Sequence, residues 1–161
     1  MSNIITIQGE QVVLPYVSEI KPVEFGLGWH WNFVVVHNFM GKTREVRICS
    51  SFSEEILDKA KDTQLDSNSS LKVYDYYFES SFANQLFIDI ASNVITNQSI
   101  SGSINNHFSY HPDCIDKLIE VFGSEENIEF EFVQSLEHAN NMRDKLIEEW
   151  DKYLSTIKYI K

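Results

Sequence analysis

Two hydrophobic periodicities follow one another along the chain. In the first third, apolar residues alternate with polar ones, as they do on a β-strand with one buried face. This alternation predicts two short strands, Ile4–Ile7 and Gln11–Leu14, joined by a glycine turn. It also predicts a hairpin in which Trp29–His37 is followed, after a short loop, by Thr43–Cys49. The N-terminal third is therefore expected to form antiparallel β-structure.

Helical periodicity dominates the C-terminal end. Apolar residues recur there every three or four positions and predict a long helix over about 136–158. A shorter helix is expected to begin at Ser51 or Ser53, both good N-caps, and another to cover Pro112–Phe122 before Gly123. The stripe on the long helix consists of Ala139, Met142, Leu146, Trp150, Tyr153 and Ile157.

Shorter alternating segments between these elements predict further strands. In the last of them, Ile128, Phe130 and Phe132 are expected to point inward, with Glu129 and Glu131 outward. Together the elements predict an α+β fold, in which an antiparallel sheet packs against the long C-terminal helix and two shorter helices. The additional strands are expected over Leu71–Glu79, Gln85–Ala91, Ile104–Tyr110 and Asn127–Val133.

Length and composition favour a single globular domain over residues 1–161. Hydrophobic residues make up 43% of the chain, enough for one core and unlike the composition of disordered chains. The first residues lack the basic and apolar regions of a secretory signal, and no apolar run approaches the ~20 residues of a membrane helix. Two cysteines, Cys49 and Cys114, make no disulfide framework. We therefore expect a cytoplasmic protein without membrane contact.

The net charge of −11 restricts the kinds of partner that the protein is expected to bind. Nucleic acids are bound through Lys and Arg, so this balance argues against a nucleic-acid binder. Between Lys72 and Arg143 there is a single basic residue, Lys117, and the charge of that stretch is −10. Its eleven acidic residues are Asp75, Glu79, Asp89, Asp113, Asp116, Glu120, Glu125, Glu126, Glu129, Glu131 and Glu137.

An uncompensated acidic stretch suggests a basic protein partner. Repulsion between clustered carboxylates costs stability, and it is tolerated where the charge steers a cationic partner to the surface. The alternative is an acidic face that is merely solvated and keeps the protein dispersed. The residues that we expect to bind the partner are Asp75, Glu79, Asp89, Glu125, Glu126, Glu129 and Glu131.

Candidate chemistry is sparse, and no cofactor or metal is expected. The spacing His107-x3-His111-x2-Cys114 suits zinc, but it supplies three ligands where a structural site needs four. His30 could share a polar sheet face with Asp75 and Asp89, which would allow acid–base chemistry in a pocket. A small α+β enzyme or ligand-binding domain with a pocket near these three residues is therefore the alternative function.

In overall profile the chain resembles the immunity proteins of bacterial toxin systems, such as those of contact-dependent inhibition. The resemblance rests on small size, a single domain, acidic balance and the acidic stretch from Asp75 to Glu137, without any shared motif. It implies a non-catalytic protein that binds a toxin domain, such as a nuclease, and covers or plugs its active site. The acidic side chains would then mimic phosphates or pair with Lys and Arg of the toxin. A scaffold subunit that forms homodimers is a further alternative.

Overall fold

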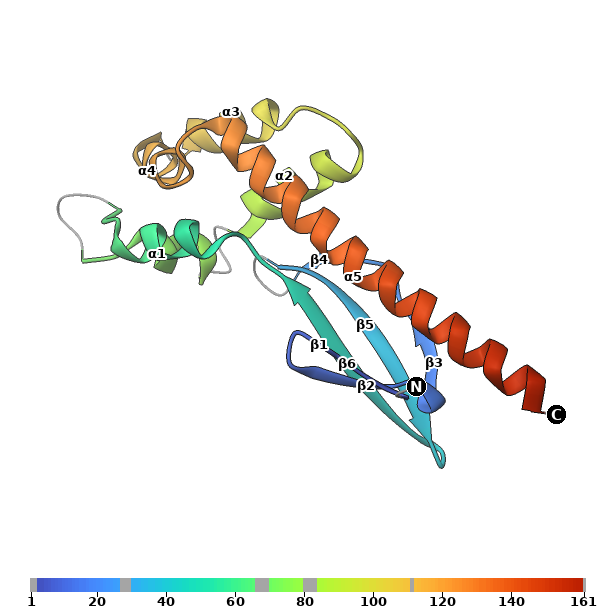
Figure 1. Cartoon of the computed structure of the whole chain (residues 1–161). Coiled ribbons are helices and arrows are strands. Elements are labelled where there is room, and N and C mark those ends of the chain that lie inside the picture. Colours follow the sequence, from blue (N-terminus) through green and yellow to red (C-terminus); the bar gives the residue numbers. More distant parts are fainter. Residues whose placement is uncertain (1–2, 27–29, 66–69, 80–83, 111, 161) are drawn as a thin grey trace. The chain divides into compact units, whose positions relative to one another are not determined.

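The chain forms antiparallel strands first and helices afterwards (Figure 1). This computed structural model describes residues 3–26, 30–65, 70–79, 84–110 and 112–160. The strands are β1 (Ile4–Ile7), β2 (Glu10–Val13), β3 (Val17–Ile20), β4 (Glu24–Gly26), β5 (His30–Phe39) and β6 (Lys42–Ser50). The helices are α1 (Glu54–Asp62), α2 (Asn84–Ile95), α3 (Ser101–Tyr110), α4 (Pro112–Phe122) and α5 (Glu125–Ile160), with short helical turns η1 (Leu14–Tyr16) and η2 (Tyr74–Phe78).

Contacts within the chain define two compact units. Unit 1 contains most of the strand residues and most of α5. Unit 2 contains α1 to α4, η2, the last two residues of β4, the first residue of β5 and the first eleven residues of α5. The expectation of a single domain stays a prediction. Unit 1 comprises Met1–Glu24, Trp31–Ser50 and Leu136–Lys161, and unit 2 comprises Phe25–His30 and Ser51–Ser135.

Two hairpins in unit 1 confirm the strands predicted in the first third of the chain. β1 pairs with β2, and β5 pairs with β6 in unbroken register from Trp31 opposite Ser50 to Phe39 opposite Lys42. Each turn has two consecutive left-handed residues, with a glycine second; in the β5–β6 turn these are Met40 (φ 53°) and Gly41 (φ 80°). Such turns match the natural twist of paired strands, and glycine adopts this conformation without steric cost.

Helix α5 covers one face of the sheet in unit 1. β5 is the central strand of a four-stranded sheet and pairs with β3, β4 and β6. Phe33 and Val35 of β5 lie in one buried cluster with Val46 and Ile48 of β6 and with Leu146 of α5. The predicted stripe on α5 is confirmed along most of its length, since Met142, Trp150 and Tyr153 pack against this cluster, whereas Ile157 is 39% exposed.

An aromatic cluster forms the centre of unit 2. The ring of Phe52, just before α1, lies 5.0 Å from that of Phe132 on α5 and 5.4 Å from that of Phe122 on α4. Phe78 of η2 and Phe87 of α2 lie 6.0 and 5.9 Å from the same ring. These distances suit edge-to-face and tilted aromatic packing. Phe52 therefore joins four separate segments of this unit.

The four additional strands were predicted wrongly, because all four segments are helical. Residues 71–79 contain the π-helical turn η2, and 85–91 and 104–110 lie within α2 and α3. Residues 127–133 belong to α5, which begins eleven residues earlier than predicted. By contrast, α4 occupies the predicted range, and α1 follows Ser53, one of the two predicted caps.

The fold class itself is confirmed: the protein is α+β, with antiparallel sheets, a long C-terminal helix on the sheet, and shorter helices. Within the ranges that the structure describes, none of the helices has both the length and the apolar character needed to cross a membrane.

Candidate functional site

Two of the predicted partner-binding acids surround a tyrosine on η2. Asp75 and Glu79 are exposed. Burial raises the pKa of Tyr74, and the hydrogen bond to Glu79 and the charges of Glu79 and Asp75 raise it further. The Nζ atom of Lys61 lies 4.9 Å from the centre of the Tyr74 ring. The structure thus gathers Asp75 and Glu79 at one point of unit 2, where a lysine lies nearby.

A second group of acids begins α5. Ser124 precedes the helix, and its Oγ accepts a hydrogen bond from the backbone N–H of Asn127 at 3.1 Å. Glu125, Glu126 and Glu129 occupy the first two turns, where carboxylates are stabilised by the positive end of the helix dipole. Glu126 and Glu129 are exposed and Glu125 is half-buried, so these side chains remain accessible to a partner.

Asp89 stands apart from both groups on α2. It is half-buried, and its Oδ1 accepts a hydrogen bond from Nε2 of Gln85, one helical turn earlier, at 2.9 Å. Among the described acids between Lys72 and Arg143, only Glu120 forms an ion pair within the chain, with Lys117 at 3.3 Å. The carboxylates of this stretch are therefore largely unpaired by the protein itself.

Glu131 does not face outward as predicted. Its side chain is only 6% exposed, and its neighbour Phe130, predicted inward, is 55% exposed. The reason is the helical period, which places Ile128, Glu131 and Phe132 on one face of α5 and turns residue 130 away. Glu131 consequently belongs to a buried polar site and not to the solvated acidic surface.

The Glu131 carboxylate accepts hydrogen bonds at the N-terminus of α1. Its Oε1 accepts two hydrogen bonds from Ser53, one from the hydroxyl at 2.6 Å and one from the backbone N–H at 3.2 Å. Ser53 occupies the N-cap position but makes no side-chain cap of its own. The carboxylate from α5 thus satisfies the backbone N–H of the N-cap residue, as the Glu of a capping box does, and lies at the positive end of the α1 dipole.

A pocket of about 470 Å³ lies beside this carboxylate in unit 2. The start of α1, the end of α4 and the start of α5 form its walls. Asn127 supports one wall, because its Nδ2 donates a 2.6 Å hydrogen bond to the carbonyl of Phe122, the last residue of α4. The lining residues are Ser53, Glu55, Ile56, Lys59, Val121, Phe122, Gly123, Asn127, Phe130, Glu131 and Gln134.

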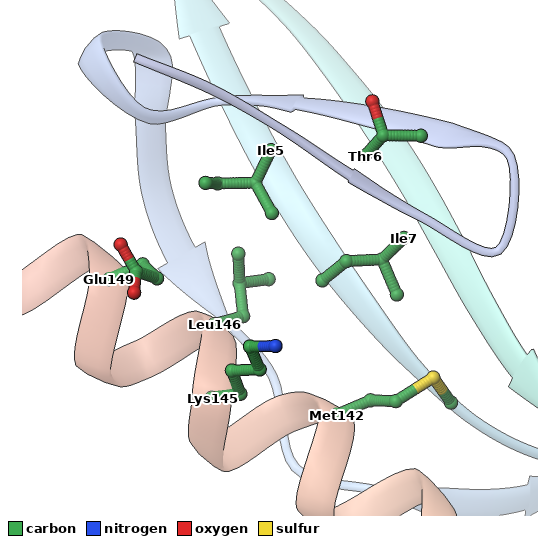
Figure 2. Close-up of a pocket in the computed structure, with 7 residues that line it drawn as sticks. All are labelled: Ile5, Thr6, Ile7, Met142, Lys145, Leu146 and Glu149. Atoms are coloured by element: carbon green, nitrogen blue, oxygen red, sulfur yellow. The ribbon is translucent and has the colours of Figure 1, made fainter. Parts of the chain in front are cut away.

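A second pocket, also of about 470 Å³, lies in unit 1 between β1 and α5. Figure 2 shows Ile5 and Ile7 of β1 facing Leu146 and Met142 of α5. The acid at its edge, Glu149, is already ion-paired with Lys152 at 3.5 Å. This pocket is therefore an apolar gap between the hairpin and the helix, and none of the predicted site residues lines it.

The acid–base pocket expected near His30, Asp75 and Asp89 stays a prediction. Neither of the two pockets is lined by His30, Asp75 or Asp89. Within the described ranges, no three His, Cys, Asp or Glu side chains lie close enough to share a metal ion. The proposed zinc spacing is only partly covered, because His111 and the side chain of Cys114 lie outside the described residues.

Two histidine contacts were not foreseen from the sequence. Ser50 Oγ lies 3.2 Å from Nδ1 of His138, and the Tyr77 hydroxyl lies 3.0 Å from Nε2 of His107. Ser50 and Tyr77 are both buried, which suits hydrogen bonds that satisfy polar groups in the interior. Each pair joins segments far apart in the sequence, so the sequence contained no local signal for them.

The charge of the chain is divided unequally between the two units. Unit 2 contains fifteen acidic residues and four lysines, a net charge of −11. Unit 1 contains nine acidic and nine basic residues and is therefore neutral. Unit 2 alone accounts for the formal charge of the whole protein.

Comparisons with protein-family models, curated proteins and solved structures gave no match to this chain.

Proposed function

We propose that this protein is a non-catalytic binding protein that neutralises a basic partner, and that it serves as an immunity protein against a toxin domain such as a nuclease. The observation that carries the proposal is the charge division, in which unit 2 holds −11 and unit 1 holds none. Such a field speeds the encounter with a cationic protein by roughly 10- to 1000-fold at low ionic strength. Glu126 and Glu129 support it further, because both are exposed and neither forms an ion pair with any residue that the structure describes.

The first test is protection from a toxin encoded next to this protein. If the gene beside that of this protein encodes an exported protein, the C-terminal domain of that protein is produced alone and with this chain, and growth of the host cells is measured. We expect the domain to be basic and toxic, and co-production of this chain to restore growth. A toxic domain that forms no complex with this chain contradicts the proposal.

Charge reversal then tests the role of unit 2. The double variant Glu126→Lys/Glu129→Lys should slow association with that domain by about tenfold at low salt, because the steering field weakens. Association rates are measured by stopped-flow fluorescence. Asp144→Lys/Asp151→Lys is the matched control, since it reverses two exposed acids of α5 in the neutral unit and should change the rate less than about twofold. Equal rates for the double variant and the control would remove unit 2 from the interface.

A further inference from the structure

We infer that the pocket beside Glu131 receives a cationic side chain of the partner, an arginine. The inference rests on the proposed function and names the group that the acidic unit would recognise at short range. Three features of the pocket support it: a buried carboxylate with bonding capacity to spare, a net negative charge of the side chains that line it, and an apolar wall with an accessible aromatic ring.

The carboxylate has one oxygen without a protein partner. Oε1 of Glu131 accepts both hydrogen bonds from Ser53, while Oε2 accepts none from the residues that the structure describes. The side chain is 94% buried, from an exposed fraction of 6%, and lines the pocket. A buried carboxylate is stabilised when its remaining lone pairs meet a charged donor, and guanidinium bonds to carboxylates are among the strongest in proteins.

The surrounding charges favour a cation on balance. Val121, Phe122 and Gly123 bring the negative C-terminal end of α4 to the pocket, but the starts of α1 and α5 bring positive helix ends, so the preference for a cation rests on the side-chain charges. Glu55 adds a second carboxylate, and Lys59 opposes it with one positive charge. Lys59 forms no ion pair with either carboxylate in the part of the chain described here, so Glu131 is not neutralised by its own protein.

The walls suit the shape of an arginine. Ile56 and Val121 are apolar and can cover the methylene groups of the side chain. Phe130 also lines the pocket and is 55% exposed, so its ring is available for stacking by a planar guanidinium. An apolar side chain turned outward next to a buried acid is explained by one ligand that uses both.

The test uses the full chain and a small probe, N-acetyl-arginine methylamide, titrated into 15N-labelled protein at low salt. We expect saturable shifts of the amide signals of Ser53, Gly123 and Asn127, with a dissociation constant of about 1 mM, as for one well-placed side chain. The matched probe is N-acetyl-citrulline methylamide, which has nearly the same shape and no charge. Equal binding of the citrulline probe, or no shift at these amides, would overturn the inference.

Matched variants separate the pocket from general acidity. Glu131→Gln should weaken arginine binding at least fivefold, whereas Glu129→Gln, an exposed acid on the same helix, should change it less than twofold. A second variant, Phe130→Ala, leaves the hydrogen bonds between Ser53 and Glu131 in place. Its control is Ile95→Ala, which removes a similarly exposed apolar side chain from α2. We expect Phe130→Ala to bind the arginine probe about threefold more weakly and Ile95→Ala to bind it as the unchanged protein does. Equal effects within either pair would contradict the inference.

The two proposals fail in different ways. If Glu126→Lys/Glu129→Lys slows association with the toxin domain while Glu131→Gln and Phe130→Ala leave complex lifetime unchanged, the proposed function stands and the pocket assignment is wrong. If the arginine probe binds at the pocket but no neighbouring domain is inhibited, the pocket stands and the proposed function is wrong.

Discussion

At the scale of single residues, His37 is the clearest case of a titratable group constrained by its surroundings. It lies on β5 and is 6% exposed. Its Nε2 accepts a 3.1 Å hydrogen bond from the backbone N–H of Val13 on β2, so the ring proton must reside on Nδ1. Nδ1 is buried without a hydrogen-bond partner among the described residues. Burial, with a smaller contribution from Arg44, lowers the pKa of His37.

Because the pKa of His37 is lowered in the folded protein, we expect the free energy of unfolding to decrease in mild acid. The unfolded chain takes up the proton at its ordinary pKa of about 6.5, whereas the folded protein resists protonation until a lower pH. The contribution of His37 is therefore complete above pH 6.5 and decreases as the pH falls toward the folded pKa. Urea unfolding at pH 7.5 and 5.5 should show a smaller decrease for His37→Asn than for the unchanged protein. His138→Asn is the control, and the same decrease in both variants would contradict this assignment.

The accessible acids were easier to foresee than the pocket. Among the described residues, Asp75, Glu79, Glu126 and Glu129 are exposed, as their polarity suggests. The sequence could not distinguish Glu131 from these exposed acids. Its burial depends on which side of α5 faces the interior and on the hydrogen bond with Ser53, which lies 78 residues earlier. Whether the seven acids bind a partner stays a prediction.

At the scale of elements, Arg143 fastens α5 to the end of β3. Its Nε donates to the carbonyl of Lys21 at 2.7 Å, and its Nη2 donates to the carbonyl of Ile20 at 3.0 Å. Both bonds are charge-assisted and satisfy backbone groups where the strand ends. Together with the hydrogen bond between Ser50 of β6 and His138, these bonds give α5 a directional attachment in addition to its apolar contacts.

Removal of this attachment should be costly. Arg143→Ala should lower the free energy of unfolding by about 1.5–3 kcal/mol, since hydrogen bonds to charged groups contribute this much. The measurement is urea unfolding followed by tryptophan fluorescence. Lys145→Ala, an exposed site on the same helix, should stay within about 0.5 kcal/mol of the unchanged protein. A loss below 0.5 kcal/mol for Arg143→Ala would show that its hydrogen bonds contribute little to the attachment of α5.

The elements that were predicted correctly have unambiguous signals. The hairpins have apolar strands on either side of glycine turns, and α4 has proline in its first turn and glycine after its last residue. The helical segment 127–133 was mistaken for a strand because Ile128 and Phe132 are four residues apart, a spacing that fits both a strand and a helix. Only Phe130 and Glu131 distinguish the two, and here the polar residue is the buried one.

The strand predictions for the segments of α2 and η2 were wrong for a related reason. In α2, Leu86, Phe87 and Ile90 are buried while Ile88 is 46% exposed, which is the pattern of a helix packed on a broad face. Tyr77 is likewise fully buried in η2. Segments with apolar residues at nearly every position hold no clear period, so tertiary packing decides their structure.

At the scale of the whole molecule, the charge division has a consequence for stability as well as binding. The fifteen acids of unit 2 repel one another, and its four lysines offset only part of that repulsion, whereas acids and bases balance in unit 1. Added salt screens this repulsion, because the Debye length falls from ~30 Å at 0.01 M to about 10 Å at 0.1 M. The acidic unit should therefore be the part of the protein that responds to ionic strength.

This response can be measured by amide hydrogen exchange at 0.01 and 0.2 M NaCl. Slowly exchanging amides of α2 and α4 should become better protected at the higher salt, by about threefold or more, while those of β5 and β6 should change little. Sodium sulfate is avoided because it stabilises proteins by exclusion from their surface. Equal protection gains in both sets of amides would show that repulsion is not concentrated in unit 2.

The composition of unit 1 has a consequence for how the protein is made. Leu146 covers Phe33, Val35 and Ile48 on the sheet, yet it is synthesised about 100 residues after β6. At translation rates of roughly 5–20 residues per second, the apolar face of the sheet remains exposed for about 5–20 s before Leu146 is synthesised. A nascent chain of this design should bind chaperones during that interval and be released from them only when its last helix leaves the exit tunnel.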